Sequence, residues 1–259
     1  MRGQIRSEIL KLRTVWSSGV IVGIAVAVMI FLALLVAFLH PPAGHPVNAL
    51  QPPRGSARWF DNVFSTLDVA QDLTLVLGIL VVTGEYRHKT VTPTYLAEPR
   101  RGRVTTAKLM VSALGGLALA AVVGAAGLAL GFVLVGAGDG TTGVMLDQFR
   151  AVIPGVLAAA GLFAVYGTGL GALVKNQVVA VVVGLGFSFV AEPVVEAIAP
   201  RVARFLPGYA AQALSGSAAR GISRVIPLLT WWEGALALVA YGIVLGCAGT
   251  LTTLRADVT

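Results

Sequence analysis

Long apolar runs alternate with short polar segments along the whole chain. Four of the runs contain no charged residue, and they cover residues 19–39, 109–136, 151–174 and 234–254. Each run reaches the roughly 20 residues that a helix needs to cross about 30 Å of hydrocarbon at about 1.5 Å per residue. The pattern therefore predicts four membrane-spanning helices.

Two further apolar runs, residues 64–83 and 178–198, carry carboxylates near one end. A carboxylate at the centre of a bilayer costs about 2.5 to 3.5 kcal/mol on insertion scales, so we expect these acids near the membrane surface. In alternating spans, all of them would lie toward the same outer side. The sequence thus predicts an all-α membrane protein with six spans in a single domain, residues 1–259; the acids in question are Asp68, Asp72, Glu192 and Glu196.

Composition supports the membrane class. Hydrophobic residues make up 56% of the chain and charged residues only 12%, whereas soluble domains average about 25% charged residues. The formal net charge of +7 is compatible with nucleic-acid binding, but it is also compatible with membrane topology. The positions of the charges distinguish these two interpretations.

The basic residues are distributed unequally between alternate connecting segments. If both termini are cytoplasmic, twelve of the 19 lysines and arginines lie on the inner side and seven on the outer side. Four of the 12 acids are inner and eight are outer. This is the asymmetry that the positive-inside rule expects, and it explains the basic excess without a nucleic-acid partner.

The segment 84–108 is the most basic part of the chain and lies between the second and third predicted spans. We expect it on the cytoplasmic side, because its charges oppose transfer across a bilayer. The alternative is an inert anchor that only fixes topology. Its basic residues are Arg87, Lys89, Arg100, Arg101, Arg103 and Lys108.

Residues 1–17 have apolar positions on one helical face, which predicts an interfacial helix on the inner side; a disordered basic tail is the alternative. Residues 40–62 contain five prolines, which predicts an irregular loop. Residues 200–227 are partly apolar, and we expect a short helix there against the outer leaflet. Glycines spaced four apart in several spans predict close helix packing, within one subunit or between subunits.

Motifs of common enzymes are missing from the sequence. It contains no H-E-x-x-H and no G-x-S-x-G, and its three histidines lack metal-site spacing. Glu192 and Glu196 share a helix face, as in an intramembrane carboxylate protease, but an interfacial position or a role at the outer mouth fits them better. Asp68 and Asp72 have the same spacing and the same interpretations.

No lysine stands in a G-x-x-x-x-G-K-[ST] pattern, so we expect the chain to hold no nucleotide of its own. The single Cys247 allows no internal disulfide. We therefore expect neither a catalytic site nor a bound cofactor or metal. Active transport driven by ATP would need a second polypeptide for hydrolysis.

One segment carries a family resemblance. Residues 77–109 read LGILVVTGEYRHKTVTPTYLAEPRRGRVTTAKL and resemble the second span, cytoplasmic coupling helix and third-span start of bacterial ABC-2 type transporter permeases. The family pattern runs G-x-L-x-V-T-x-E-Y-R-x-x-T, then P-x-R, then A-K. One departure is Lys89, where many relatives carry glycine. The matching positions are Gly78, Glu85, Tyr86, Arg87, Thr90, Pro99, Arg101 and Lys108.

Shorter segments extend the resemblance over nearly the whole chain. SEILKLRT before the first span is similar to the family's N-terminal interfacial helix, and LVKNQ at residues 173–177 is similar to its second cytoplasmic loop. RFLPGYAAQAL at residues 204–214 is similar to its outer segment between the last two spans.

The resemblance implies the permease subunit of an ATP-driven exporter in the bacterial cytoplasmic membrane. Such a subunit works as a homodimer or heterodimer with two separate ATP-binding subunits, which carry the ATP and Mg²⁺. It also implies that Glu85, Tyr86, Arg87, Thr90, Pro99, Arg101 and Lys108 couple this chain to the ATPase. The nearly charge-free spans favour an amphipathic or hydrophobic substrate, such as a drug, lipid or peptide.

Two other functional classes remain open. One is a membrane scaffold or assembly subunit that transports nothing. The other is a secondary transporter, which usually needs ionisable groups near the bilayer midplane and interrupted helices. An adjacent reading frame for a P-loop ATPase, or copurification of such a subunit, would distinguish the exporter from both.

Overall fold

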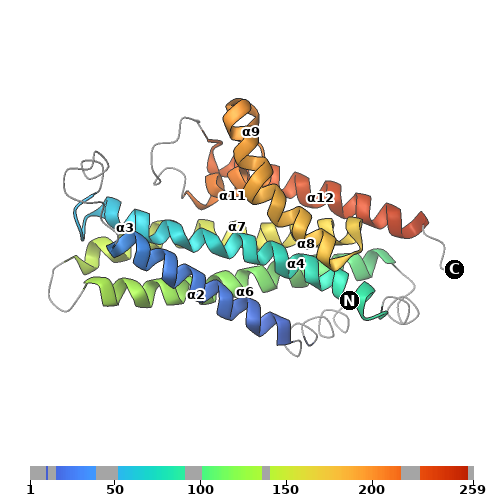
Figure 1. Cartoon of the computed structure of the whole chain (residues 1–259), viewed down its shortest axis with the longest axis horizontal. Coiled ribbons are helices and arrows are strands. Elements are labelled where there is room, and N and C mark those ends of the chain that lie inside the picture. Colours follow the sequence, from blue (N-terminus) through green and yellow to red (C-terminus); the bar gives the residue numbers. More distant parts are fainter. Residues whose placement is uncertain are drawn as a thin grey trace.

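A computed structural model describes residue 10 and residues 16–38, 52–90, 101–135, 141–216 and 228–255 (Figure 1). Within these ranges the fold is helical and contains no strand. The elements are α2 (Trp16–Phe38), α3 (Ala57–Phe64), η2 (Ser65–Asp68), α4 (Val69–Arg87), α6 (Arg101–Val135), α7 (Thr142–Val174), α8 (Gln177–Gly186), η3 (Phe187–Ala191), α9 (Glu192–Ile198), α10 (Pro200–Ala203), α11 (Pro207–Ser215) and α12 (Trp231–Arg255).

Six helical segments of the described chain are long and apolar enough to cross a membrane. They are Gly19–Phe38, Ala57–Arg87, Gly102–Val135, Thr142–Val174, Gln177–Ile198 and Trp231–Gly249. The expected all-α architecture with six candidate spans is therefore confirmed at this level. The predicted interfacial helix at residues 1–17 falls almost entirely outside the described residues.

Several helices continue beyond the uncharged runs that predicted them. The second span was expected at 64–83 but is helical from Ala57 to Arg87, and the third starts at Arg101 rather than 109. The fourth starts at Thr142 rather than 151 and contains Asp147, Arg150 and Pro154. Charged residues mark where a helix leaves the hydrocarbon, but they do not interrupt its backbone hydrogen bonds, so the helices extend beyond the apolar runs.

The predicted irregular loop at 40–62 is wrong for its last part. Ser56 begins α3 as its N-cap, with its hydroxyl oxygen accepting a hydrogen bond from the Trp59 backbone N–H at 3.3 Å. Trp59 and Phe60 are then buried. The capping side chain and the aromatic residues establish a helix that the preceding prolines obscured in the sequence.

The long helices α2, α4, α6 and α7 run side by side, with α12 along another flank of α7 (Figure 1). The C-terminus of α4, the N-terminus of α6 and the N-terminus of α8 meet at one end, which we call the connector end. The fifth span, α8 to α9, rises obliquely from there across the bundle (Figure 1). A π-helical turn, η3, interrupts it.

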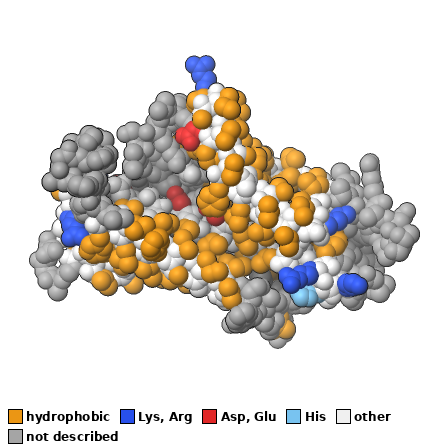
Figure 2. All heavy atoms as spheres, in the orientation of Figure 1, with side chains coloured by type: hydrophobic (Ala, Val, Ile, Leu, Met, Phe, Trp, Pro, Cys, Tyr) orange, Lys and Arg blue, Asp and Glu red, His pale blue; other side chains and the backbone are white. Residues whose placement is uncertain are grey.

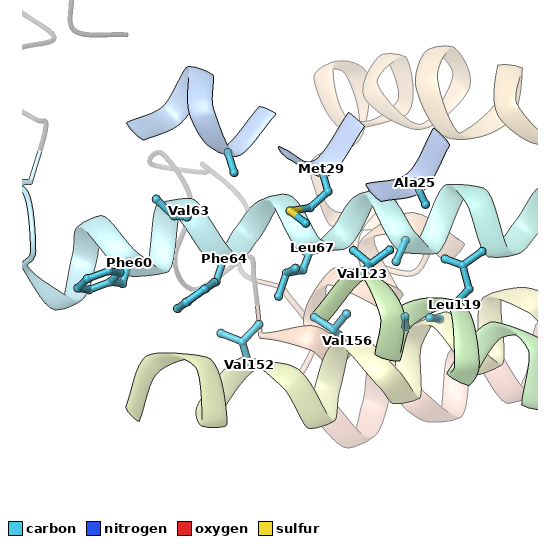
Figure 3. Close-up of a cluster of buried hydrophobic side chains, with 14 of the residues drawn as sticks. Ala25, Met29, Phe60, Val63, Phe64, Leu67, Leu119, Val123, Val152 and Val156 are labelled. Atoms are coloured by element: carbon cyan, nitrogen blue, oxygen red, sulfur yellow. The ribbon is translucent and has the colours of Figure 1, made fainter. Parts of the chain in front are cut away.

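A first core cluster lies between α2, α3, η2, α4, α6 and α7 (Figure 3). Met29 of α2 points toward the second span, and Leu67 of η2 lies against Gly127 of α6; the two side chains are 1% and 0% exposed. These contacts hold the first span against the rest of the bundle. The labelled members of the cluster are Ala25, Met29, Phe60, Val63, Phe64, Leu67, Leu119, Val123, Val152 and Val156.

Helices α4 and α7 pack almost backbone to backbone. A Cβ added at Gly78 of α4 would meet the carbonyl oxygen of Ala164, and one added at Gly167 of α7 would meet that of Leu75. Close approach through glycine is how membrane helices gain van der Waals contact without a hydrophobic driving force. Of the two alternatives that the glycine spacing left open, packing within one subunit therefore holds for Gly167.

The outer surface of the bundle is apolar. Figure 2 shows hydrophobic side chains over α2 and over the oblique fifth span. In that span, Val178, Val182, Phe189 and Val190 are each more than 60% exposed. A soluble protein rarely exposes such a continuous apolar surface, so this face suits lipid.

Candidate functional site

Glu85 and Lys108 meet at the connector end. Glu85 lies in the last turn of α4 and Lys108 in the second turn of α6, and the Lys108 Nζ is 2.7 Å from the Glu85 Oε1. The side chain of Glu85 is only 10% exposed and that of Lys108 only 8%. The two residues that the sequence motif placed in separate blocks therefore form one largely buried ion pair.

The pair joins two helices that are separated in the sequence, since α4 ends at Arg87 and α6 begins at Arg101. Taking both charges out of water is costly, and only close, well-aligned pairing offsets that cost. The contact consequently fixes the C-terminus of α4 relative to the N-terminus of α6. A neighbouring polar contact acts similarly between α6 and α7, where the hydroxyls of Thr168 and Ser112 are 2.7 Å apart and buried.

Arg87 and Thr90 extend the site. An Nη1 of Arg87 donates a hydrogen bond to the Gln177 Oε1 at 3.4 Å, which brings the start of α8 to the end of α4. The backbone N–H of Thr90 donates to the carbonyl oxygen of Glu85 at 2.9 Å and closes the turn after α4. Within that turn, Lys89 adopts a left-handed backbone conformation with φ of 55°.

Lys89 is the position at which the sequence departs from the permease-like pattern. A left-handed conformation favours glycine, because a Cβ is crowded there, so lysine adopts it at some cost.

Two of the remaining predicted coupling residues lie in described helices. Tyr86 is partly buried in the last turn of α4, and Arg101 is the first residue of α6. Pro99 and the expected coupling helix fall outside the described residues. The segment 84–108 is in part helical, because α4 ends at Arg87 and α6 begins at Arg101.

The four acids of the second and fifth spans occupy different environments. Asp68 accepts a hydrogen bond from the Gln71 Nε2 at 2.9 Å on its own helix. Glu192 is only 4% exposed, and its Oε1 accepts a hydrogen bond from the Gly208 backbone N–H at 2.9 Å. Glu196 accepts one from the Tyr209 hydroxyl. The acids of the fifth span therefore hold the start of α11.

This arrangement differs from the expected segment against the outer leaflet. Tyr209, Ala210 and Ala211 of α11 are buried, with the two alanines in a second core cluster that includes Phe163 of α7 and Leu238 of α12. The helix in 200–227 is present, but it packs onto the bundle. Sequence reasoning missed Gly208 and Tyr209 as partners of the acids, and their only signal was the short GY pair following a proline.

Asp72 and Glu192 come from different spans but lie within electrostatic range of each other. The sequence placed both acids on one side of the membrane without bringing them together. Tyr166, also missed, is a third member of this neighbourhood, since the charge of Glu192 acts on its phenol. Among the described residues, no group of three His, Cys, Asp or Glu side chains is arranged to hold a metal ion.

Comparison of the chain with protein-family models and with curated proteins gives no match.

Proposed function

We propose that this chain is the permease subunit of an ATP-driven exporter and is coupled to a separate ATP-binding subunit at the connector end. The observation that carries the proposal is the buried ion pair between Glu85 and Lys108. These two residues stand in separate blocks of the permease-like pattern, and their contact makes the two blocks one physical unit.

Charge supports a cytoplasmic position for the connector end. Basic side chains gather around it, and bases are enriched on the cytoplasmic side of membrane proteins. They would offer an exposed cationic surface to a soluble partner at the anionic inner leaflet. The described basic residues that are exposed or partly exposed at this end are Arg87, Lys89, Arg103 and Lys175, whereas Lys108 is buried against Glu85.

The packing suggests how motion would be transmitted. A partner that closes on ATP would displace the segment between α4 and α6. The ion pair would carry that displacement to both helices, and the contact of Gly78 and Gly167 would carry it from α4 to α7. Rigid packing favours movement of these helices as a unit, which changes access to the space between subunits. ATP and Mg²⁺ would be bound by the partner.

The test is reconstitution with the ATP-binding subunit that copurifies with the tagged chain from its native membrane. We expect Glu85→Ala to insert and to retain the ATPase, but to lose ATP-dependent export while hydrolysis continues. Asp147→Asn is the control. Asp147 is exposed and lies near the N-terminus of α7, whereas the C-terminus of α7 leads to α8 at the connector end. Undiminished export by Glu85→Ala, or no associated ATPase, would contradict the proposal.

A secondary transporter is the second candidate, and two observations favour it. Asp72 and Glu192 interact within apolar spans, and the fifth span is interrupted by the π-helical turn η3. Ionisable groups and broken helices are features of ion-coupled carriers. Uptake or efflux in vesicles that contain this chain alone, driven by an ion gradient without ATP, would favour this candidate over the exporter.

A further inference from the structure

Two lysines at the connector end adopt a backbone conformation that favours glycine. Lys89 lies in the turn after α4 with φ of 55°, and Lys175 is the C-cap of α7 with φ of 59°. No other described residue except glycine has a positive φ. A left-handed backbone crowds the Cβ, so each lysine carries a cost that glycine would avoid. Strain of this kind concentrates at functional sites, and it makes the two lysine side chains candidates for a function.

The turns that contain the two lysines lie next to each other. Arg87, in the last turn of α4, donates a hydrogen bond to the side chain of Gln177 at the start of α8. Arg87 stands two positions before Lys89, and Gln177 two positions after Lys175. Close by, a Cβ added at Gly171 of α7 would meet the backbone of α4. Arg87, Lys89 and Lys175 therefore form one group, which we call the basic turn cluster.

Described acids are scarce around the basic turn cluster. The last turn of α7 and the first turns of α6 and α8 contain none. Glu85, in the last turn of α4, is paired with Lys108. Arg87 and Lys89 are exposed, and Lys175 is partly exposed. The described part of this end therefore presents a net positive charge at its surface.

The basic turn cluster borders a surface that suits lipid. Helix α8 starts at Gln177, and its Val178 and Val182 are each more than 60% exposed. Figure 2 shows basic side chains beside the hydrophobic surface at this end. An anionic phospholipid has the matching pair of chemistries, because its charged phosphate adjoins apolar chains and basic residues near a membrane surface attract such headgroups. A soluble anion would use only the charged half of this surface.

We propose that Arg87, Lys89 and Lys175 bind the headgroup of an anionic phospholipid whose acyl chains lie along α8. Lysines near a helix C-terminus also offset the helix dipole. That role needs no left-handed lysine, since a lysine within the last turn supplies the same charge without strain. The inference goes beyond the proposed coupling role and does not depend on an ATP-binding partner.

The experiment uses the purified, delipidated full-length chain in a non-ionic detergent. Native mass spectrometry follows phospholipid binding during titration with dioleoyl phosphatidylglycerol. Dioleoyl phosphatidylcholine has the same acyl chains but no net charge, so it measures apolar contact alone. We expect saturable binding of phosphatidylglycerol, with an affinity at least about tenfold above that of phosphatidylcholine.

Charge-removing variants then locate the site. We expect Arg87→Gln, Lys89→Gly and Lys175→Gly each to weaken phosphatidylglycerol binding about fivefold, the effect of one basic residue near an anionic surface. The two glycine variants should be at least as thermally stable as the unmodified chain, because they relieve strain. Lys89→Arg keeps the charge and should keep the affinity.

Arg150→Gln is the matched control. Arg150 is an exposed base near the N-terminus of α7, whereas Lys175 caps the C-terminus of the same helix. We expect this variant to bind phosphatidylglycerol as the unmodified chain does. Size-exclusion profiles report folding, and the use of two separate turns keeps the test decisive if one variant fails to fold.

Three results would overturn the proposal. Equal affinities for the two phospholipids would show that charge does not select the lipid. Unchanged phosphatidylglycerol affinity in all three cluster variants would assign these bases to topology or to a soluble protein instead. Displacement of the phospholipid by an equal concentration of glycerophosphoglycerol, which is the same headgroup without acyl chains, would make the cluster a site for a soluble anion.

Discussion

Lys108 is a lysine buried in an apolar bundle, and its Nζ lies 2.7 Å from the carboxylate of Glu85. Loss of one member of a buried ion pair typically costs about 3 to 5 kcal/mol, because the other charge loses its close partner. We therefore expect Lys108→Met to lower the free energy of unfolding by about that amount. Unfolding by SDS titration in mixed micelles measures it.

The double variant is the matched control. Glu85→Gln with Lys108→Met removes both charges and keeps side chains of similar volume. We expect its stability to return to within about 1 kcal/mol of the unmodified chain, because paired burial is nearly neutral when both charges are replaced. If the loss of stability in the double variant equals the sum of the losses in Glu85→Gln alone and Lys108→Met alone, the two residues do not act as a pair.

At this scale the sequence identified residues but not their pairing. The order of the motif singled out Glu85 and Lys108, yet their contact depends on α4 continuing to Arg87 and α6 beginning at Arg101. Likewise, the spacing of Glu192 and Glu196 placed them near a membrane surface. Only the folding of α11 over them reveals that Gly208 and Tyr209 are their partners.

Among the elements, the contact between α4 and α7 is the tightest test of the fold. In Gly167→Ala, the new Cβ would lie 3.1 Å from the Leu75 Cα and closer still to its carbonyl oxygen. Backbone cannot yield as a flexible side chain can, so we expect a net loss of about 1 to 3 kcal/mol. The SDS unfolding midpoint measures it.

Gly23→Ala is the control for that change. Nothing lies within 4 Å of a Cβ at Gly23, and alanine is the better helix former. We expect this variant to be as stable as the unmodified chain or slightly more stable. Equal effects of the two substitutions would show that α4 and α7 do not approach as closely as described.

The turn between α7 and α8 tests a second element. Asn176 is the N-cap of α8, and its Oδ1 accepts a hydrogen bond from the Val179 N–H at 3.1 Å. We expect Asn176→Ala to cost about 1 kcal/mol, and Asn176→Ser to recover most of it because serine also caps. Equal stability of the alanine and serine variants in the same titration would argue against the cap.

Element existence was predictable because a membrane span needs a long apolar run, and each of the six candidate spans contains one. Element boundaries were not, since Asp147 and Arg150 lie inside α7 without ending it. The interruption at η3 has no clear sequence signal, as its residues Phe187–Ala191 are apolar like their neighbours.

For the whole molecule, the sequence predicted a bundle of six spans but not its arrangement. The fifth span, α8 to α9, runs obliquely across the bundle, and Glu192 at the start of α9 contacts Gly208 of α11; no local sequence pattern encodes either feature. Because six is an even number, the start of the first span and the end of the sixth span would lie on the same side of the membrane. Which side faces the cytosol rests on the distribution of charges.

The orientation of the connector end is the claim on which the coupling role depends, and cysteine labelling in intact cells tests it most directly. In a Cys247→Ser background, His88→Cys reports on the connector end and Arg201→Cys on α10, beyond the far end of the fifth span. We predict that a membrane-impermeant maleimide labels Arg201→Cys in intact cells and His88→Cys only after permeabilisation. Labelling of His88→Cys from the cell exterior would contradict both the topology and the proposed contact with a cytosolic ATPase.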